Sequence, residues 1–182
     1  MDNITLIGMP GSGKSTVGVV LAKMLGMAFV DIDLVIQHRE GALLQELIDR
    51  HGNEAFLDME RDAICSLNCR RSVIAPGGSV IHREESLRHL HALGPIVYLK
   101  VPLDELLVRL GDISKRGITL PAGQGVPDLY AARCPLYEAC ADFTADCSGN
   151  QRIEDSARQV IRLVRDLPAL RDVIPAGPAR NF

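Results

Sequence analysis

Three features that the sequence lacks exclude several classes of protein. Its five cysteines form no C-x-x-C pair, so neither a disulfide framework nor a zinc site is supported. Lysine and arginine form no block, and the net charge of -3 gives no electrostatic reason to bind nucleic acid. No apolar run approaches the roughly 18 to 20 residues that a membrane span requires. We therefore expect no nucleic-acid partner and no membrane partner.

The start and the composition of the chain predict a cytoplasmic, globular protein. The first predicted strand begins almost at Met1, which leaves no room for a signal peptide. Internal repeats and low-complexity tracts are absent, while 47% of the 182 residues are hydrophobic and 24% are charged. These proportions are ordinary for one folded domain with a full core.

A glycine-rich stretch near the N-terminus reads Gly-Met-Pro-Gly-Ser-Gly-Lys-Ser over residues 8–15. It fits the phosphate-binding loop pattern G-x-x-x-x-G-K-[ST], in which the backbone curls until several N–H groups face one phosphate site. Lys14 adds a positive charge, the Ser15 hydroxyl is placed to ligate Mg²⁺, and the helix that starts at Thr16 favours anions at its N-terminus. The nucleotide-binding residues predicted here are Gly11, Ser12, Gly13, Lys14, Ser15 and Thr16.

The flanks of this loop follow the order strand, loop, helix. Residues 4–7 are apolar and β-branched, as a buried parallel strand should be. After the loop, apolar residues recur at helical spacing until Gly26, which is a stop signal. A glycine-rich turn without a ligand is the alternative, and the correct flanks argue against it.

Two acidic residues follow the next apolar run, 28–30. Alternation in Asp31-Ile32-Asp33 would point both carboxylates to the same side of an extended segment. The carboxyl ends of parallel strands line the ligand crevice of an open α/β sheet, so we predict that these carboxylates act at the phosphate site. The alternative is that Asp33 caps the helix that follows it.

The rest of the chain alternates between predicted helices and strands. Helices are expected over 34–69 with a break at His51-Gly52, and then over 103–110, 128–141 and 153–164; strands are expected over 72–75, 95–99 and 143–146. The turn at Pro76-Gly77-Gly78-Ser79 either lets a ligand approach the backbone or is a plain turn. Together these elements predict a three-layer α/β sandwich with a mostly parallel sheet.

Residues 111–126 and the C-terminal tail are predicted to differ from the elements around them. The first is rich in glycine and proline and contains Lys115-Arg116, so it resembles a mobile lid over a phosphate site, with a plain surface connection as the alternative. The tail from Pro168 has three prolines and no apolar periodicity, so little regular structure is expected there.

With these residues in place, the sequence resembles the shikimate kinase family of P-loop kinases. The resemblance rests on Gly11-Ser-Gly-Lys-Ser-Thr-Val-Gly18, Phe29-Val-Asp-Ile-Asp33, the helix with Phe56 and Glu60, Gly77-Gly78, and Arg133-Cys-Pro-Leu-Tyr137. It implies one P-loop kinase domain over 1–165 with five parallel strands in the order 2-3-1-4-5. It also implies a helical substrate-binding insertion over 34–69, a lid over 111–126, and a tail over 166–182.

The resemblance implies a monomeric enzyme that uses MgATP to phosphorylate shikimate to shikimate 3-phosphate, a step of aromatic amino-acid biosynthesis. Asp31 would hold Mg²⁺ through water, and Asp33 would orient the acceptor hydroxyl or take its proton. Lys14 and the lid residue Arg116 would stabilise the transferring phosphoryl group. Gly77, Gly78 and Arg133 would bind the acceptor, with Arg133 on its carboxylate, and Arg109 with the turn 146–148 would border the adenine.

The acceptor segment departs from the family pattern and leaves two alternatives open. The family motif Phe-Arg-x-x-Glu is Phe56-Leu57-Asp58-Met59-Glu60 here, so leucine replaces an arginine that binds the carboxylate. Asp58 could instead bind an amine, which would favour a hydroxy amino acid such as homoserine. An ATP-binding protein without transfer activity is the other alternative, whereas the guanine motif Asn-Lys-x-Asp of GTPases does not occur.

Overall fold

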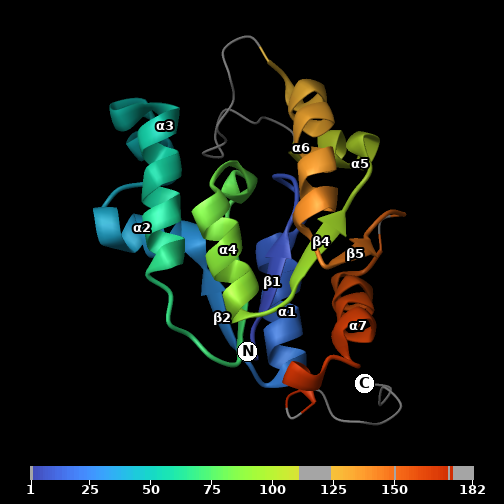
Figure 1. Ribbon diagram of the computed structural model, residues 1–182. Helices are drawn as coiled ribbons and strands as arrows, with labels where there is room; N and C mark the ends of the chain where they lie inside the picture. The colour runs from blue at the N-terminus through green and yellow to red at the C-terminus, as the bar shows by residue number, and fades with distance from the viewer. Residues whose placement is uncertain (1, 111–123, 150, 172, 174–182) are drawn as a thin grey trace.

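A parallel five-stranded sheet forms the centre of the molecule (Figure 1). The computed structural model describes residues 2–110, 124–149, 151–171 and 173. Its strand order is β2-β3-β1-β4-β5, and all neighbouring strands are parallel, which confirms the predicted fold class and order. The strands are β1 (Ile4–Ile7), β2 (Ala28–Asp31), β3 (Ser72–Ala75), β4 (Ile96–Lys100) and β5 (Phe143–Asp146).

Helices cover both faces of this sheet. In sequence order they are α1 (Lys14–Leu25), α2 (Ile32–Glu40), α3 (Leu44–Cys65), α4 (Glu84–Leu93), α5 (Leu103–Leu110), α6 (Val126–Cys140) and α7 (Ile153–Val164). The crossovers from β1 to β2 and from β3 to β4 run in opposite directions, so right-handed connections place α1 and α4 on opposite faces. Helix α7 packs beside α1, and α3 packs beside α4.

The central strands are buried on both faces because helices lie above and below them. Ile4, Leu6 and Ile7 of β1 have no exposed surface, and all four residues of β3 are buried. This explains why these strands read as continuous apolar runs rather than as alternating patterns. The core therefore fixes the positions of the loops at the carboxyl ends of β1 and β3.

Some helices begin or end at other residues than the sequence predicted. Helix α1 begins at Lys14 rather than at Thr16, and α6 continues through Pro135 from Val126. The predicted break in the long helical segment is confirmed, because Gly52 has non-helical angles (φ 81, ψ 169) inside α3. In the tail, where little regular structure was expected, Pro168–Leu170 form a short 3-10 helix, η3, because Leu170 is fully buried against the core.

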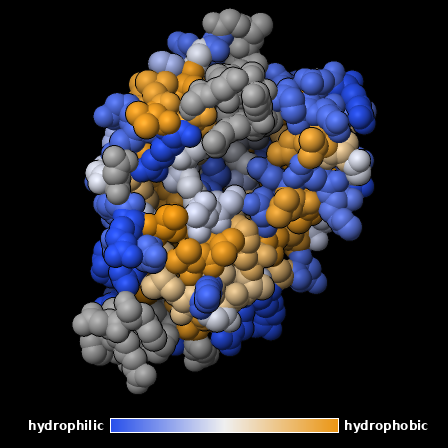
Figure 2. Space-filling view, turned by 180° about the vertical axis from the view of Figure 1, so that it is seen from behind, coloured by the Kyte–Doolittle hydropathy of each residue, from blue (hydrophilic) through white to orange (hydrophobic). Residues whose placement is uncertain are grey.

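The outer surface mixes polar and apolar side chains. In the face opposite to that of Figure 1, hydrophobic residues form several patches, the broadest of them below the middle, and hydrophilic residues border them (Figure 2). Among the helices that the structure describes, none combines the length and the apolar character needed to cross a membrane.

Asn3 ties together three segments at the end of the sheet that lies away from the phosphate-binding loop. Its Nδ2 donates to the carbonyl oxygens of Cys69 (2.9 Å) and Leu93 (3.2 Å), and its Oδ1 accepts from the Ser72 N–H (2.9 Å). Asn3 is 2% exposed, so these bonds satisfy polar groups that water cannot reach. They align β1 with the start of β3.

We expect Asn3→Ala to lower the free energy of unfolding by about 2 to 3 kcal/mol, because it leaves the buried Ser72 N–H without this acceptor. Urea denaturation measures the change. The exposed Asn68 provides a matched control, and Asn68→Ala should change stability by less than about 0.5 kcal/mol. Equal losses in the two variants would contradict the role given to Asn3.

Candidate active site

A cavity of about 470 Å³ lies beside the glycine-rich loop, at the carboxyl ends of β1, β2 and β3. This is the edge of an open parallel sheet at which ligands bind. The residues that line it are Pro10, Gly11, Gly13, Lys14, Ser15, Thr16, Asp33, Phe56, Pro76, Gly77, Gly78, Ser79, Arg109 and Arg133.

The loop between β1 and α1 has the curled backbone that its glycines predict. Gly11 and Gly13 have φ values of 80 and 94, in the region that side chains disfavour, and a Cβ on Gly11 would lie 2.9 Å from Leu110. Lys14 Nζ donates to the carbonyl oxygens of Gly8 (2.9 Å) and Met9 (3.1 Å), which holds the loop around its own lysine. Ser15 and Thr16 follow in the first turn of α1 and face the cavity.

Asp31 and Asp33 lie close together, but the extended segment predicted for them is wrong. Asp31 ends β2 and is the N-cap of α2, and its Oδ1 accepts from the Asp33 N–H (3.0 Å). Asp33 is therefore in the first turn of the helix and lines the cavity. The cap that was considered for Asp33 belongs to Asp31, because an N-cap carboxylate reaches the N–H two residues later.

The charges of this cavity are altered by burial. Burial lowers the pKa of Lys14 to about 8, although the nearby Asp33 and Glu60 carboxylates oppose the shift. Burial and the neighbouring Asp31 carboxylate raise the pKa of Asp33 to about 6, against the effect of Lys14. At neutral pH the two groups are therefore mostly charged, yet both titrate within about one to two pH units of it.

One wall of the cavity is the backbone of Gly77 and Gly78, which follows β3. The Glu60 Oε1 lies against Gly77, where a side chain would collide with it, and the same side chain would lie 3.3 Å from the Asp33 Oδ1. The Ser79 hydroxyl donates to the Glu60 Oε2 (2.6 Å). The two carboxyl groups thus approach the same point of the Gly77 main chain.

Helix α6 supports the same wall from the other side. A Cβ on Gly78 would lie 3.3 Å from the Arg133 Nη1 and 3.0 Å from the Pro10 ring. The Tyr137 hydroxyl donates to the Gly78 carbonyl oxygen (2.5 Å), and its ring stacks on Tyr98 with centroids 5.3 Å apart. Arg133, which is 4% exposed, is therefore held beside the wall that it faces.

Glu105 links Arg109, which lines the cavity, to the turn after β5. Arg109 lines the cavity, and its Nη2 bonds with the Glu105 Oε2 (2.9 Å). The other oxygen of Glu105 accepts from the Gly149 N–H (2.6 Å), directly after the turn 146–148. The predicted neighbours of an adenine thus lie in one region.

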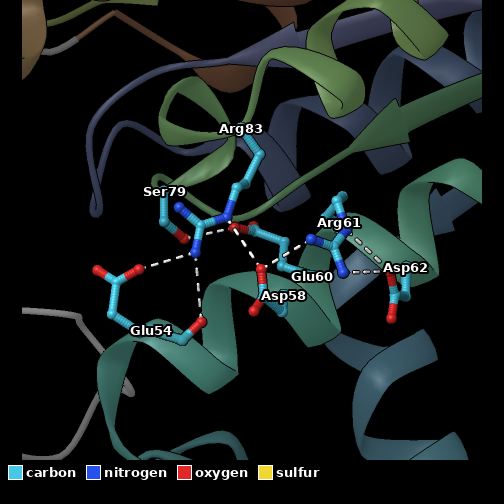
Figure 3. Close-up of polar contacts among 7 residues, drawn as sticks. All are labelled: Glu54, Asp58, Glu60, Arg61, Asp62, Ser79 and Arg83. Atoms are coloured by element: carbon cyan, nitrogen blue, oxygen red, sulfur yellow. Dashed lines mark hydrogen bonds and ion pairs between the residues drawn. The ribbon is translucent and has the colours of Figure 1, made fainter.

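Of the predicted site residues that the structure describes, Asp31, Ser12 and Asp58 do not line the cavity. Asp58 is absent from its lining, because its carboxylate pairs with Arg83 (3.1 Å) and Arg61 (2.9 Å) on another face of α3 (Figure 3). The Ser12 side chain is buried beneath the loop and does not line the cavity. Arg116 and residues 111–123 of the predicted lid lie outside the described residues.

Glu60 and Ser79 were given no role in the predicted site, although Glu60 belongs to the motif that carries the family resemblance. Ser79 lines the cavity, and Glu60 reaches the site through its bond with Ser79. Glu60 follows Phe56 by four positions and so shares its helix face, whereas Asp58 is two positions away and points elsewhere. Phe56 lines the cavity, so helical spacing could have selected Glu60 over Asp58. Leu57 is 7% exposed and does not line the cavity.

Comparisons with known proteins agree with this geometry. A family model described as shikimate kinase matches residues 10–165. Shikimate kinase from Thermodesulfovibrio yellowstonii is 35% identical over 165 residues, which cover 89% of this chain and 94% of that protein. Shikimate kinase from Vibrio vulnificus is 34% identical over 167 residues, covering 90% and 96%. A solved structure, shikimate kinase from Acinetobacter baumannii in complex with shikimate, superposes with a TM-score of 0.81 and 30% identity, covering 91% of this chain and 93% of that one.

We expect Tyr137→Phe to lower the free energy of unfolding by about 1 to 2 kcal/mol, because the Gly78 carbonyl oxygen loses its donor while the stacked ring is kept. Urea denaturation provides the measurement. Tyr130→Phe is the control, since Tyr130 lies on the same helix and its hydroxyl bonds with Cys134 rather than with the wall. A loss no larger in Tyr137→Phe than in the control would contradict this support.

Proposed function

The chain belongs to the shikimate kinase family, and from this premise we propose that it transfers a phosphoryl group from ATP to shikimate, giving shikimate 3-phosphate. It is thus a small-molecule kinase that uses ATP and acts on a hydroxylated acceptor. The observation that carries the proposal is a single cavity that joins the phosphate-binding loop to Asp33 and Arg133.

We assign the nucleotide phosphates to the loop between β1 and α1. Its main-chain N–H groups, with the first turn of α1, supply the positive potential that a phosphate requires. The Lys14 ammonium group, which bonds with loop carbonyls in the free protein, lies close enough to turn toward the transferring phosphoryl group. Arg109 then borders the base, as Glu105 holds it beside the turn after β5.

The acceptor is assigned to the opposite side of the same cavity. Arg133 binds the shikimate carboxylate, and Asp33 accepts the hydrogen bond of the reacting hydroxyl. The hydroxyl oxygen bonds to the γ-phosphorus, the bond to the ADP oxygen breaks, and the hydroxyl proton passes to Asp33 or water. A carboxylate with a pKa of about 6 is ionised at neutral pH and is more basic than an ordinary aspartate.

The residues also fit a magnesium ion held mainly by phosphate oxygens. Within residues 2–110, 124–149, 151–171 and 173, no three metal-ligating side chains gather into a site of their own. Mg²⁺ with nucleotides needs only one or two protein oxygens and keeps several waters. Ser15 and Asp31 would provide these oxygens, Asp31 through water, and the ion would neutralise charge that develops on the phosphates.

The remaining assignments extend this proposal to the whole chain. We propose one kinase domain over 1–165, with 34–69 forming the acceptor side, 111–126 forming a lid, and 166–182 forming a tail. Arg116 would complete the phosphate site from that lid. We also propose a cytoplasmic monomer without nucleic-acid or membrane partners.

No observation favours homoserine as the acceptor. That alternative needs Asp58 to meet an amine, and the Asp58 carboxylate is already paired with Arg83 and Arg61 outside the cavity.

The test of the proposed function is release of ADP from MgATP by the purified chain, with shikimate, with homoserine and without acceptor. We expect release that depends on shikimate, and mass spectrometry should detect phosphorylated shikimate. Lys14→Ala controls for contaminating kinases and should lose about a hundredfold or more in turnover. Release that depends only on homoserine, or on no acceptor, would contradict the proposal.

We expect Asp33→Asn to reduce turnover by about a hundred- to ten-thousandfold and to leave ATP affinity nearly unchanged. In the native enzyme, kcat/KM for shikimate should fall as pH drops through about 6, because Asp33 gains a proton there. Steady-state kinetics and nucleotide titration separate the two effects. If ATP binding collapsed in Asp33→Asn, Asp33 would serve the nucleotide and its assignment to the acceptor would be wrong.

A further inference from the structure

We propose that Glu60 positions the acceptor wall as a neutral carboxylic acid, so that acceptor binding is tight when Glu60 holds its proton and weakens when Glu60 ionises. Glu60 is thus a positioning residue that acts through Gly77 and Ser79. The inference deepens the proposed function and rests on it, because it requires an acceptor that carries a carboxylate.

The first support is the hydrogen bonding of the Glu60 side chain. Glu60 is 2% exposed, and its Oε2 accepts one short bond from Ser79 (2.6 Å). Its Oε1 lies against the Gly77 main chain and has no hydrogen-bond partner in the described part of the protein. An ionised carboxylate can only accept hydrogen bonds and is costly to bury with one donor, whereas the neutral acid needs fewer partners.

The second support is the set of charges around Glu60. Lys14 from α1 and Arg133 from α6 favour its ionised form, and Asp33 from α2 opposes it. Burial, together with the Asp33 carboxylate, outweighs the Ser79 bond and the two cations and raises the pKa of Glu60 to about 7. The group therefore exchanges its proton in the range where the enzyme would work.

The third support is that nearby arginines are engaged elsewhere. Arg61 bonds with Asp58 and Asp62, and Arg83 lies between Asp58 and Glu54, while Glu60 points to Ser79 (Figure 3). Leu57, which lies three positions before Glu60 on α3, is buried and uncharged. Helix α3 therefore brings no further cation toward Glu60.

The consequence is a linkage between the acceptor and a proton. A carboxylate bound by Arg133 adds negative charge on one side of the Gly77-Gly78 wall, and an ionised Glu60 would repel it from the other. Acceptor binding should therefore raise the pKa of Glu60 further and take up a proton, and by reciprocity proton loss should weaken binding.

Isothermal titration calorimetry of shikimate with the full chain tests this at pH 6.5 and 8.5, in two buffers of different ionisation enthalpy. For the native protein we expect Kd to rise about three- to tenfold between these pH values, with proton uptake on binding near pH 7.5. Glu60→Gln stays neutral and can still accept a hydrogen bond from Ser79. The ratio of its Kd values at the two pH values should therefore be at least threefold smaller than the native ratio, and binding should take up less proton. Asp62→Asn removes one exposed carboxylate from the same helix and should behave like the native protein.

Each contrary result has a distinct meaning. If the Kd of Glu60→Gln for shikimate depends on pH as strongly as that of the native protein, the proposal is overturned. If Glu60→Gln does not bind shikimate at either pH, the proposal is also overturned, because binding would then require the ionised form of Glu60. If Glu60→Gln does not fold, absence of proton uptake by the native protein overturns it without the variant. Failure of the native protein to bind shikimate at any pH would contradict the proposed function and this inference with it. Binding without a contribution from Glu60 contradicts the inference alone.

Discussion

Gly77 and Gly78 have no side chains, and this allows four elements to approach one another at the carboxyl end of β3. Glu60 from α3 and Asp33 from α2 lie against Gly77, and Pro10 and Arg133 lie against Gly78. A side chain at Gly77 would displace Glu60. The main chain of this wall is therefore the common boundary of the phosphate site, the acceptor site and the helices that support them.

The same close approach controls the charges of the site. Glu60 is buried, and Lys14 and Asp33 are partly buried beside the cavity; burial is the largest cause of each pKa shift. The shifts bring all three groups near neutrality, where an ordinary lysine or carboxylate does not titrate. One packing arrangement thus supplies both the shape of the cavity and its acid-base properties.

The sequence predicted the strands and the phosphate loop, since both depend on local patterns: apolar runs and fixed glycine spacing. The order of the strands followed from the family resemblance and not from these patterns. Sequence reasoning failed where tertiary contacts decide. Asp31 caps α2 rather than continuing a strand, and Asp58 pairs with Arg83, a residue 25 positions away. Glu60 could have been found from its helical spacing to Phe56, but its bond with Ser79 depends on how α3 meets the wall, which no local pattern contains.

The central claim is that burial around this wall holds two carboxyl groups far above their ordinary pKa values. Carbon-13 NMR of side-chain carboxyl groups in the ligand-free protein, followed across pH, tests it most directly, with Asp33→Asn and Glu60→Gln to assign the signals. We predict that Asp33 titrates near pH 6 and Glu60 near pH 7. Titration of both groups below about pH 5, as in exposed carboxylates, would contradict the account.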